Sequence, residues 1–240
     1  MMDFQNIDFG RIAFLVSVWA LPVLVAITFH EAAHGFVAWR LGDDTARLEG
    51  RVSFNPLRHI DSFGTILLPA MLLLASGGRL MFGYAKPVPV NFGRLGKPRR
   101  DMVLVAAAGP AINILLLAAS ALLLKALSMV APPVHPGSVA EWAVYNLINS
   151  ASINAVLAVF NLLPIPPLDG GRIAVGLLPS ASARALARME RIGIVLILGA
   201  LLVLPWLGRM VGLDLDLFWW LVGAPAEYLV KTAFALAGVR

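Results

Sequence analysis

A cluster of chemically active side chains stands in the motif His30-Glu31-Ala32-Ala33-His34. Positions i and i+4 share one face of an α-helix, so His30 and His34 can offer ring nitrogens to one metal ion. Glu31 lies beside them and can accept a proton from a water molecule that the metal has activated for attack on a peptide carbonyl. The motif therefore predicts a zinc-dependent peptide hydrolase with Glu31 as the catalytic base.

Five-residue matches also arise by chance, so the position of this motif in the chain matters for its interpretation. It lies late in an apolar run that begins at Ile12 and continues to Arg40, in a chain that is 59% hydrophobic and 14% charged. Ionisable side chains are expensive to bury in a membrane helix, and there they indicate a functional site. The competing interpretation is a pair of core histidines and a paired glutamate without a metal.

The elements that must position these residues are hydrophobic helices. The composition predicts an all-α polytopic membrane protein with five to six hydrophobic helical segments. A short extended or hairpin element is expected between the first and third segments, because the run Ser62–Gly78 is short and contains Gly64 and Pro69. We expect one membrane domain over 1–240, with a catalytic core at about 12–175 and accessory membrane helices at about 190–235.

Basic residues predict how these segments are oriented. If 62–78 re-enters, one membrane side carries all but three of the 19 Lys and Arg residues. The three on the other side are Arg11, Lys125 and Arg209. Cytoplasmic loops carry an excess of Lys and Arg, so the basic side is expected to be cytoplasmic in a bacterial cell membrane. The late end of the first helix and the end of the fourth apolar run then meet at this cytoplasmic face.

The third metal ligand must be His, Asp or Glu, because the chain contains no cysteine. Asp169 is favoured because it ends an apolar segment, lies on the predicted cytoplasmic side and precedes Gly170-Gly171, which give the backbone freedom to aim it. His59 and His135 are the alternatives. An ordinary Asp-Gly turn is the other interpretation of Asp169.

Hydrolysis inside a membrane also needs a partner for an opened, extended substrate. Prolines in PIPP disfavour helix, so Pro164, Ile165 and Pro166 are expected to present extended backbone to a substrate strand. Asn161 is expected to bind substrate by polarising the scissile carbonyl. Plain connecting chain and helix-to-helix hydrogen bonding are the alternatives for these residues.

Two other groups of residues receive simpler interpretations. The small residues Ala106–Gly109 predict a face for close helix packing, with Asn113 hydrogen-bonding across it. The basic stretch Arg94–Arg100 predicts a contact with anionic lipid at the cytoplasmic surface. Nucleic acid is not an expected partner, because no recognition fold accompanies the net charge of +5. The sequence leaves the oligomeric state open.

With HEAAH, AAAGPAIN and FNLLPIPPLDGG in this order, the chain resembles the site-2 protease family of intramembrane zinc metalloproteases, in a short form without a PDZ or CBS module. The resemblance covers about residues 20–175. It implies one zinc ion held by His30, His34 and Asp169, with Glu31 as the base and a substrate-handling role near Asn161. It also implies cleavage of membrane-anchored proteins or peptides toward the cytoplasmic side.

A metal-binding transporter or a non-catalytic scaffold is the alternative function. Glu31 separates the two classes, because a transported or structural ion does not need a base beside an open coordination position.

Overall fold

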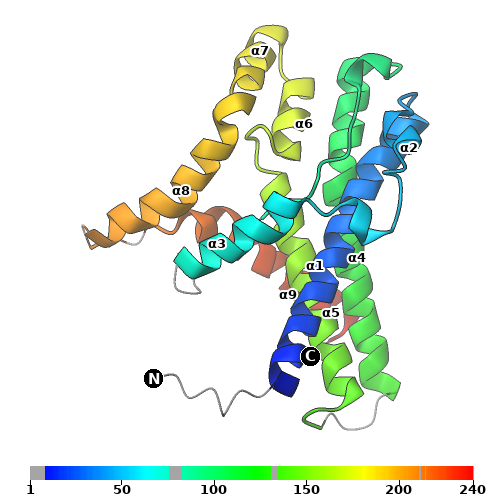
Figure 1. Cartoon of the computed structure of the whole chain (residues 1–240), viewed down its shortest axis with the longest axis vertical. Helices are drawn as coiled ribbons and strands as arrows, with labels where there is room; N and C mark the ends of the chain where they lie inside the picture. Colours follow the sequence, from blue (N-terminus) through cyan, green and yellow to red (C-terminus); the bar gives the residue numbers. More distant parts are fainter. Residues whose placement is uncertain (1–8, 76–82, 131–134, 211, 214, 240) are drawn as a thin grey trace.

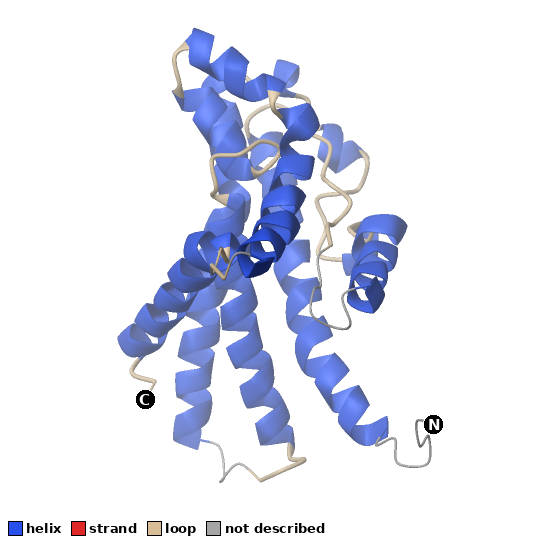
Figure 2. Ribbon diagram, turned by 90° about the vertical axis from the view of Figure 1, so that its left-hand side faces the viewer, coloured by secondary structure: helices blue, strands red, loops and turns tan. Residues whose placement is uncertain are grey.

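The computed structural model describes residues 9–75, 83–130, 135–210, 212–213 and 215–239, and these are all-helical with connecting loops. No strand occurs among the described residues (Figure 2). Three long apolar helices form the body of the molecule: α1 (Phe9–Arg40), α4 (Pro98–Val130) and α5 (Val139–Asn161). Each of them contacts the other two. The predicted all-α class is therefore confirmed.

Within the described residues, three helices are long and apolar enough to cross a membrane. They are Ala13–Arg40, Pro98–Val130 and Val139–Asn161. A bilayer core about 30 Å thick needs about 20 helical residues, which each of these provides. The structure thus supports a membrane protein with three candidate spans, and the larger number of five to six stays a prediction.

The second hydrophobic run is helical as far as it is described. A π-helical turn, η3 (Ser62–Leu67), leads into the helix α3 (Leu68–Ala75). The carboxylate of Asp61 accepts hydrogen bonds from two backbone N–H groups of the first turn and so caps it. At 1.5 Å per residue, the eight residues of α3 reach about 12 Å, far less than a bilayer core. Residues 76–78 lie outside the described residues, so the predicted hairpin stays a prediction.

The ends of the long helices follow local signals in the sequence. The hydroxyl of Ser138 accepts a hydrogen bond from the N–H of Glu141 and caps the start of α5. Pro98 occupies the first position of α4, where its missing N–H costs nothing. After α1, the chain turns through Gly42, whose φ of 109° favours glycine.

Small side chains allow the long helices to pack closely. Ala151 and Ala155 on α5 are fully buried and form one cluster with Leu117 of α4. Helices in lipid gain little from hydrophobic burial against one another, so close contact between small residues matters more. The helix α9 (Ala224–Ala237) covers this cluster and packs on both α4 and α5.

Three of the shorter helices lie at one end of this bundle (Figure 1), and they are α2 (Thr45–Leu48), α6 (Asp169–Leu177) and α7 (Ser180–Arg188). The other elements are the short turns η2 (Pro56–Arg58), η4 (Phe92–Arg94) and η5 (Trp219–Gly223) and the long helix α8 (Glu190–Met210). The helix α6 packs against α4, whereas α8 runs outward from the bundle. Near its start, α8 touches the chain before α6, because a Cβ built on Gly193 would overlap the carbonyl of Pro166.

Candidate metal centre

The structure brings His30, His34 and Asp169 together where α1 meets the start of α6. One ligand atom from each side chain lies within 4.8 Å of the other two. The Nε2 atoms of His30 and His34 are 3.0 Å apart. Oδ2 of Asp169 lies 3.2 Å from Nε2 of His30 and 3.3 Å from Nε2 of His34. Residues far apart in the sequence therefore converge at one place, and they are the three that the sequence predicts as metal ligands.

The outer ring nitrogens show which atoms face this centre. Nδ1 of His34 lies 2.8 Å from the carbonyl oxygen of Val105, which can only accept, so Nδ1 carries the proton. Nδ1 of His30 lies 2.6 Å from Oδ1 of Asn113. With both rings neutral and protonated on Nδ1, both Nε2 atoms turn their lone pairs toward Asp169.

Three lone-pair atoms at these separations repel one another unless a cation lies between them. Tetrahedral zinc with bonds of about 2.0–2.1 Å separates neighbouring ligand atoms by about 3.3–3.4 Å. The separations of 3.0, 3.2 and 3.3 Å are close to this value. Oδ2 of Asp169 is also buried without a hydrogen-bond partner among the described residues. The residues present therefore fit a zinc ion.

The charge of Asp169 agrees with this donor set. An aspartate carboxyl group has an ordinary pKa of about 3.9, and a metal cation beside it would lower that pKa further. The carboxylate is therefore anionic at neutral pH. Two neutral imidazoles and one carboxylate make a ligand set typical of catalytic zinc sites.

The third wall of the centre is the backbone of α4 at Gly109. A Cβ built there would lie 2.5 Å from Cε1 of His30 and 2.5 Å from Nε2 of His34. Any side chain at 109 would thus enter the space beside the ligand nitrogens. The sequence predicts helix packing for Gly109 and Asn113 and does not indicate their contacts with the histidines. The only signal for those contacts was their place in the AAAGPAIN motif.

Glu31 is held by the irregular segment 83–91, which connects the second hydrophobic run to α4. The N–H of Val88 donates a hydrogen bond of 2.9 Å to Oε2 of Glu31. Pro87 and Pro89 on either side have no N–H, so Val88 supplies the amide at this point. A backbone amide thus fixes one oxygen of the carboxylate that the motif assigned as the base.

Several polar contacts hold this segment in place. The N–H of Lys86 donates to the carbonyl of His59 over 2.9 Å. The guanidinium of Arg51 donates to the carbonyls of Lys86 and Pro87 over 2.5 and 3.2 Å. Asp43, which is fully buried, accepts from the N–H of Asn91 over 2.6 Å. The position of the amide beside Glu31 is therefore set by residues well outside the motif.

The predicted substrate-binding residues are bonded within their own segments. Nδ2 of Asn161 donates to the carbonyl of Leu157 in its own helix, over 3.0 Å. The N–H of Ile165 donates to the carbonyl of Leu163 over 2.7 Å, and the chain from Pro164 to Pro166 forms a compact turn. The expected extended edge is therefore absent there in this structure.

The glycines after Asp169 explain why this segment folds back on itself. A Cβ built on Gly170 would lie 2.2 Å from the carbonyl oxygen of Leu162, and one on Gly171 would lie 2.3 Å from the nitrogen of Pro166. The start of α6 therefore lies directly against the turn before it. This close approach, in addition to backbone freedom, delivers Asp169 to the two histidines.

The two alternative ligands lie outside this group. His59 is 2% exposed, and its Nε2 lies 2.9 Å from the carbonyl of Ser53. His135 is exposed in the loop before α5. Among the described residues, the metal-ligating group of three contains His30, His34 and Asp169 instead.

Comparisons with known proteins agree with this geometry. The family model for Peptidase family M50 matches residues 124–205. Over 228 residues, the chain is 36% identical to a Bacillus subtilis protein named "Putative zinc metalloprotease YwhC", and the alignment covers 92% of this chain and 93% of that protein. The chain belongs to peptidase family M50.

A second relative is less similar to the chain. It is a Mycobacterium tuberculosis protein named "Putative zinc metalloprotease Rip2", 33% identical over 189 residues, with 79% of this chain and 66% of that protein covered. No solved structure matches the chain. The predicted resemblance to the site-2 protease family, which is peptidase family M50, is thus confirmed. The names of the relatives specify zinc, and the ligand group of this M50 chain fits a zinc ion.

Proposed function

We propose that this M50 chain is a zinc endopeptidase that cleaves membrane-anchored proteins within or beside the cytoplasmic side of the bilayer. The proposal rests mainly on one observation: Asp169 lies beside His30 and His34, which belong to an apolar helix that also contains Glu31. Ionisable groups in such a helix are costly, so their convergence is best explained by function.

Each side chain of the centre has a distinct role in this proposal. His30 and His34 would each hold a zinc ion through one ring nitrogen, and Asp169 would hold it through one carboxylate oxygen. With only three protein ligands, the ion would supply an activated water molecule, because catalytic zinc lowers the pKa of bound water to about 7. Glu31 does not belong to the ligand group, and its carboxylate accepts the proton during attack and returns it to the leaving amine.

Substrate is proposed to bind between the segment 83–91 and the turn at 164–166. Asn161 would release the carbonyl of Leu157 and turn its amide toward the scissile carbonyl. The turn formed by Pro164, Ile165 and Pro166 would form the wall on the Asp169 side. A hydrogen bond that Asn161 makes to its own helix is easily exchanged for one to substrate, because both are neutral amide contacts.

The rival function, a transporter or scaffold, accounts less well for Glu31. A carried or structural ion has no use for a carboxylate outside its ligand set, whereas here a backbone amide holds that carboxylate in place. Hydrolysis needs such a base within reach of the open position.

Purified protein in lipid vesicles with a panel of single-span membrane substrates tests the proposal. We expect Glu31→Gln to lower cleavage about 100- to 10,000-fold while zinc stays bound. Asp169→Ala is expected to lose both zinc and cleavage. The matched control is Glu49→Gln, at an exposed glutamate in the loop after α2, and it should cleave like the wild type.

The rival function has different outcomes in the same assay. Cleavage that persists at the wild-type rate in Glu31→Gln would refute the assigned mechanism. Zinc uptake into vesicles by a wild type that cleaves no substrate would favour a transporter instead.

A further inference from the structure

A chain of amide side chains runs from His30 into the middle of the helix bundle. Oδ1 of Asn113 lies 2.6 Å from Nδ1 of His30, and Nδ2 of Asn113 donates to Oδ1 of Asn154 over 2.8 Å. Nδ2 of Asn154 in turn donates to the backbone carbonyl of Ser150 over 2.8 Å. Asn113 and Asn154 are both fully buried. This amide chain therefore links α5, α4 and α1 where no bulk water competes.

The direction of every hydrogen bond in the amide chain follows from its far end. The carbonyl of Ser150 can only accept, so the atom of Asn154 that faces it must be the NH₂ group. Oδ1 of Asn154 then faces Asn113, so Asn113 must also present its NH₂ group there. The carbonyl of Ala26, 3.5 Å from Nδ2 of Asn113, favours the same orientation.

The directions of these hydrogen bonds determine which ring nitrogen of His30 carries the proton. Asn113 presents Oδ1 to His30, and an oxygen can only accept, so Nδ1 of His30 must carry a proton. In the neutral ring, Nε2 then has a free lone pair, and it faces Nε2 of His34 and Oδ2 of Asp169. A rotated Asn113 would instead favour the tautomer that cannot bind a metal through Nε2.

We propose that Asn113, oriented by Asn154, is a positioning residue that fixes the tautomer and direction of His30 for metal binding. The proposal rests on the zinc centre proposed above and adds to it two residues on helices that contribute no ligand. Its rival is a purely structural role, in which these amides only hold the helices together. The two roles differ in what they do to zinc affinity.

The experiment measures zinc affinity of the full chain in detergent by competition with a chelator, without any substrate. We expect Asn113→Leu to weaken zinc binding about 10- to 100-fold, the usual effect of losing the partner of a metal-binding histidine. Asn154→Leu should weaken it less, because Asn113 keeps its oxygen but loses the group that orients it. Asn113→Asp restores an acceptor for Nδ1 and should bind zinc more tightly than Asn113→Leu.

A second amide on α5 provides the matched control. Asn149 is 8% exposed, and its Nδ2 donates to the carbonyl of Val18 on α1 over 2.8 Å, so it also joins two helices but does not reach His30. Asn149→Leu should lower the thermal unfolding temperature about as much as Asn113→Leu while keeping wild-type zinc affinity. Visible absorption of the cobalt-loaded variants gives an independent readout, because the bands should change for Asn113→Leu and not for Asn149→Leu.

Two results would overturn the proposal. One is wild-type zinc affinity in Asn113→Leu, and the other is an equal loss of affinity in Asn149→Leu. A wild type that binds zinc but cleaves no substrate would refute the proposed protease function and leave the role of Asn113 intact, so the two failures are distinguishable.

Discussion

Gly109 limits what the metal centre can accommodate. Its backbone lies so close to the ligand nitrogens of His30 and His34 that a single added carbon would be 2.5 Å from both rings. Helix backbone is stiff, and the histidines are held from behind by Asn113 and Val105. Neither side can give way easily, so the absence of a side chain at 109 is a chemical requirement of the site.

Gly109→Ala is therefore expected to weaken zinc binding about 5- to 150-fold, since overpacking at a tight contact costs about 1–3 kcal/mol. Chelator competition measures this loss. Gly199→Ala is the matched control, because Gly199 also lies within a helix but has open space around its missing Cβ. It should keep wild-type affinity, and similar losses in both variants would contradict the role given to Gly109.

At the scale of elements, the segment 83–91 has more influence on the site than its irregular shape suggests. The N–H of Tyr84 donates to the carbonyl of Gly64, and the N–H of Lys86 donates to the carbonyl of His59. The N–H of Val88 donates to Glu31. Donation by every second residue is typical of extended chain, whose successive N–H groups point to opposite sides. The segment therefore acts as a spacer that sets where the Val88 amide meets the base.

Val88→Pro removes the amide that holds Glu31. We expect cleavage to fall about 10- to 100-fold, because a hydrogen bond to a charged group contributes about 1.5–3 kcal/mol, while zinc affinity stays unchanged. Ala85→Pro serves as the control, since the N–H of Ala85 makes no hydrogen bond within the described part of the segment. Equal activity of the two variants would show that the contact with Glu31 is unimportant.

Asp43 holds the other end of this segment by a hydrogen bond and should make the stability of the folded protein depend on pH. Burial raises the pKa of Asp43, but its hydrogen bonds outweigh burial and lower the pKa below its ordinary value. The donors are the hydroxyl and N–H of Thr45 and the N–H of Asn91, and the nearby charge of Arg94 acts in the same direction. A carboxyl whose pKa is depressed by folding stabilises the folded state above its unfolded pKa of about 3.9 and loses this effect as pH falls through the folded value.

The expected difference in stability between the wild type and Asp43→Asn is about 1–3 kcal/mol near neutral pH. It should stay constant down to about pH 5 and shrink below about pH 4. Thermal unfolding in detergent across this range measures it. A difference that grew on acidification would contradict the depressed pKa of Asp43.

Local and non-local features of these elements differ in how far the sequence predicts them. The i, i+4 spacing of His30 and His34 is a property of one helix, so it could be read directly from the motif. Asp169 followed from topology, because the basic loops indicate which segment ends share a face. The contacts of Asn113 and Val88 depend on how helices rotate and how a loop folds across them, and no local pattern sets either. The PIPP turn was predicted extended because its prolines exclude helix, but prolines also allow tight turns.

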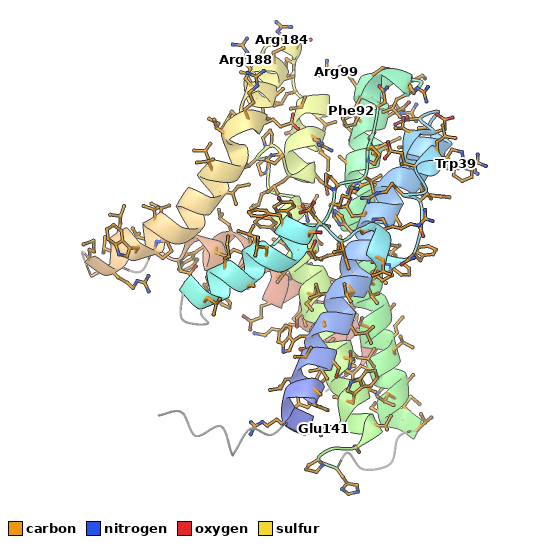
Figure 3. The ribbon with its side chains drawn as sticks, viewed as in Figure 1. Trp39, Phe92, Arg99, Glu141, Arg184 and Arg188 are labelled. Atoms are coloured by element: carbon orange, nitrogen blue, oxygen red, sulfur yellow. The ribbon has the colours of Figure 1, made fainter. Side chains whose placement is uncertain are left out.

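At the scale of the whole molecule, charge is distributed unevenly along the long axis. Arg99, Arg184 and Arg188 lie at one end and Glu141 lies at the other (Figure 3). Some basic residues at the basic end have internal partners, since Arg94 pairs with Asp44 and Arg99 donates to the carbonyl of Leu178. We propose that the basic end faces the cytoplasm and that the exposed side chains within 94–100 contact anionic lipid there.

Cysteine labelling tests this orientation, because the chain has no cysteine of its own. Lys97→Cys and Val139→Cys place thiols on exposed residues, one in the basic stretch and one at the first residue of α5. In intact cells, a membrane-impermeant thiol reagent should label Val139→Cys but not Lys97→Cys. The reverse pattern would place the basic end, and the metal centre with it, toward the outside.

The position of Asp169 at the start of α6 gives zinc a mechanical part in the fold. The ion would join the first long helix to a short helix that follows the third, and so act as a cross-link in a chain that has no disulfides. Binding to the folded state alone adds about 2.7 kcal/mol of stability when free zinc is 100 times its dissociation constant. Zinc supply would then govern how long the protein survives in the membrane as well as how fast it works.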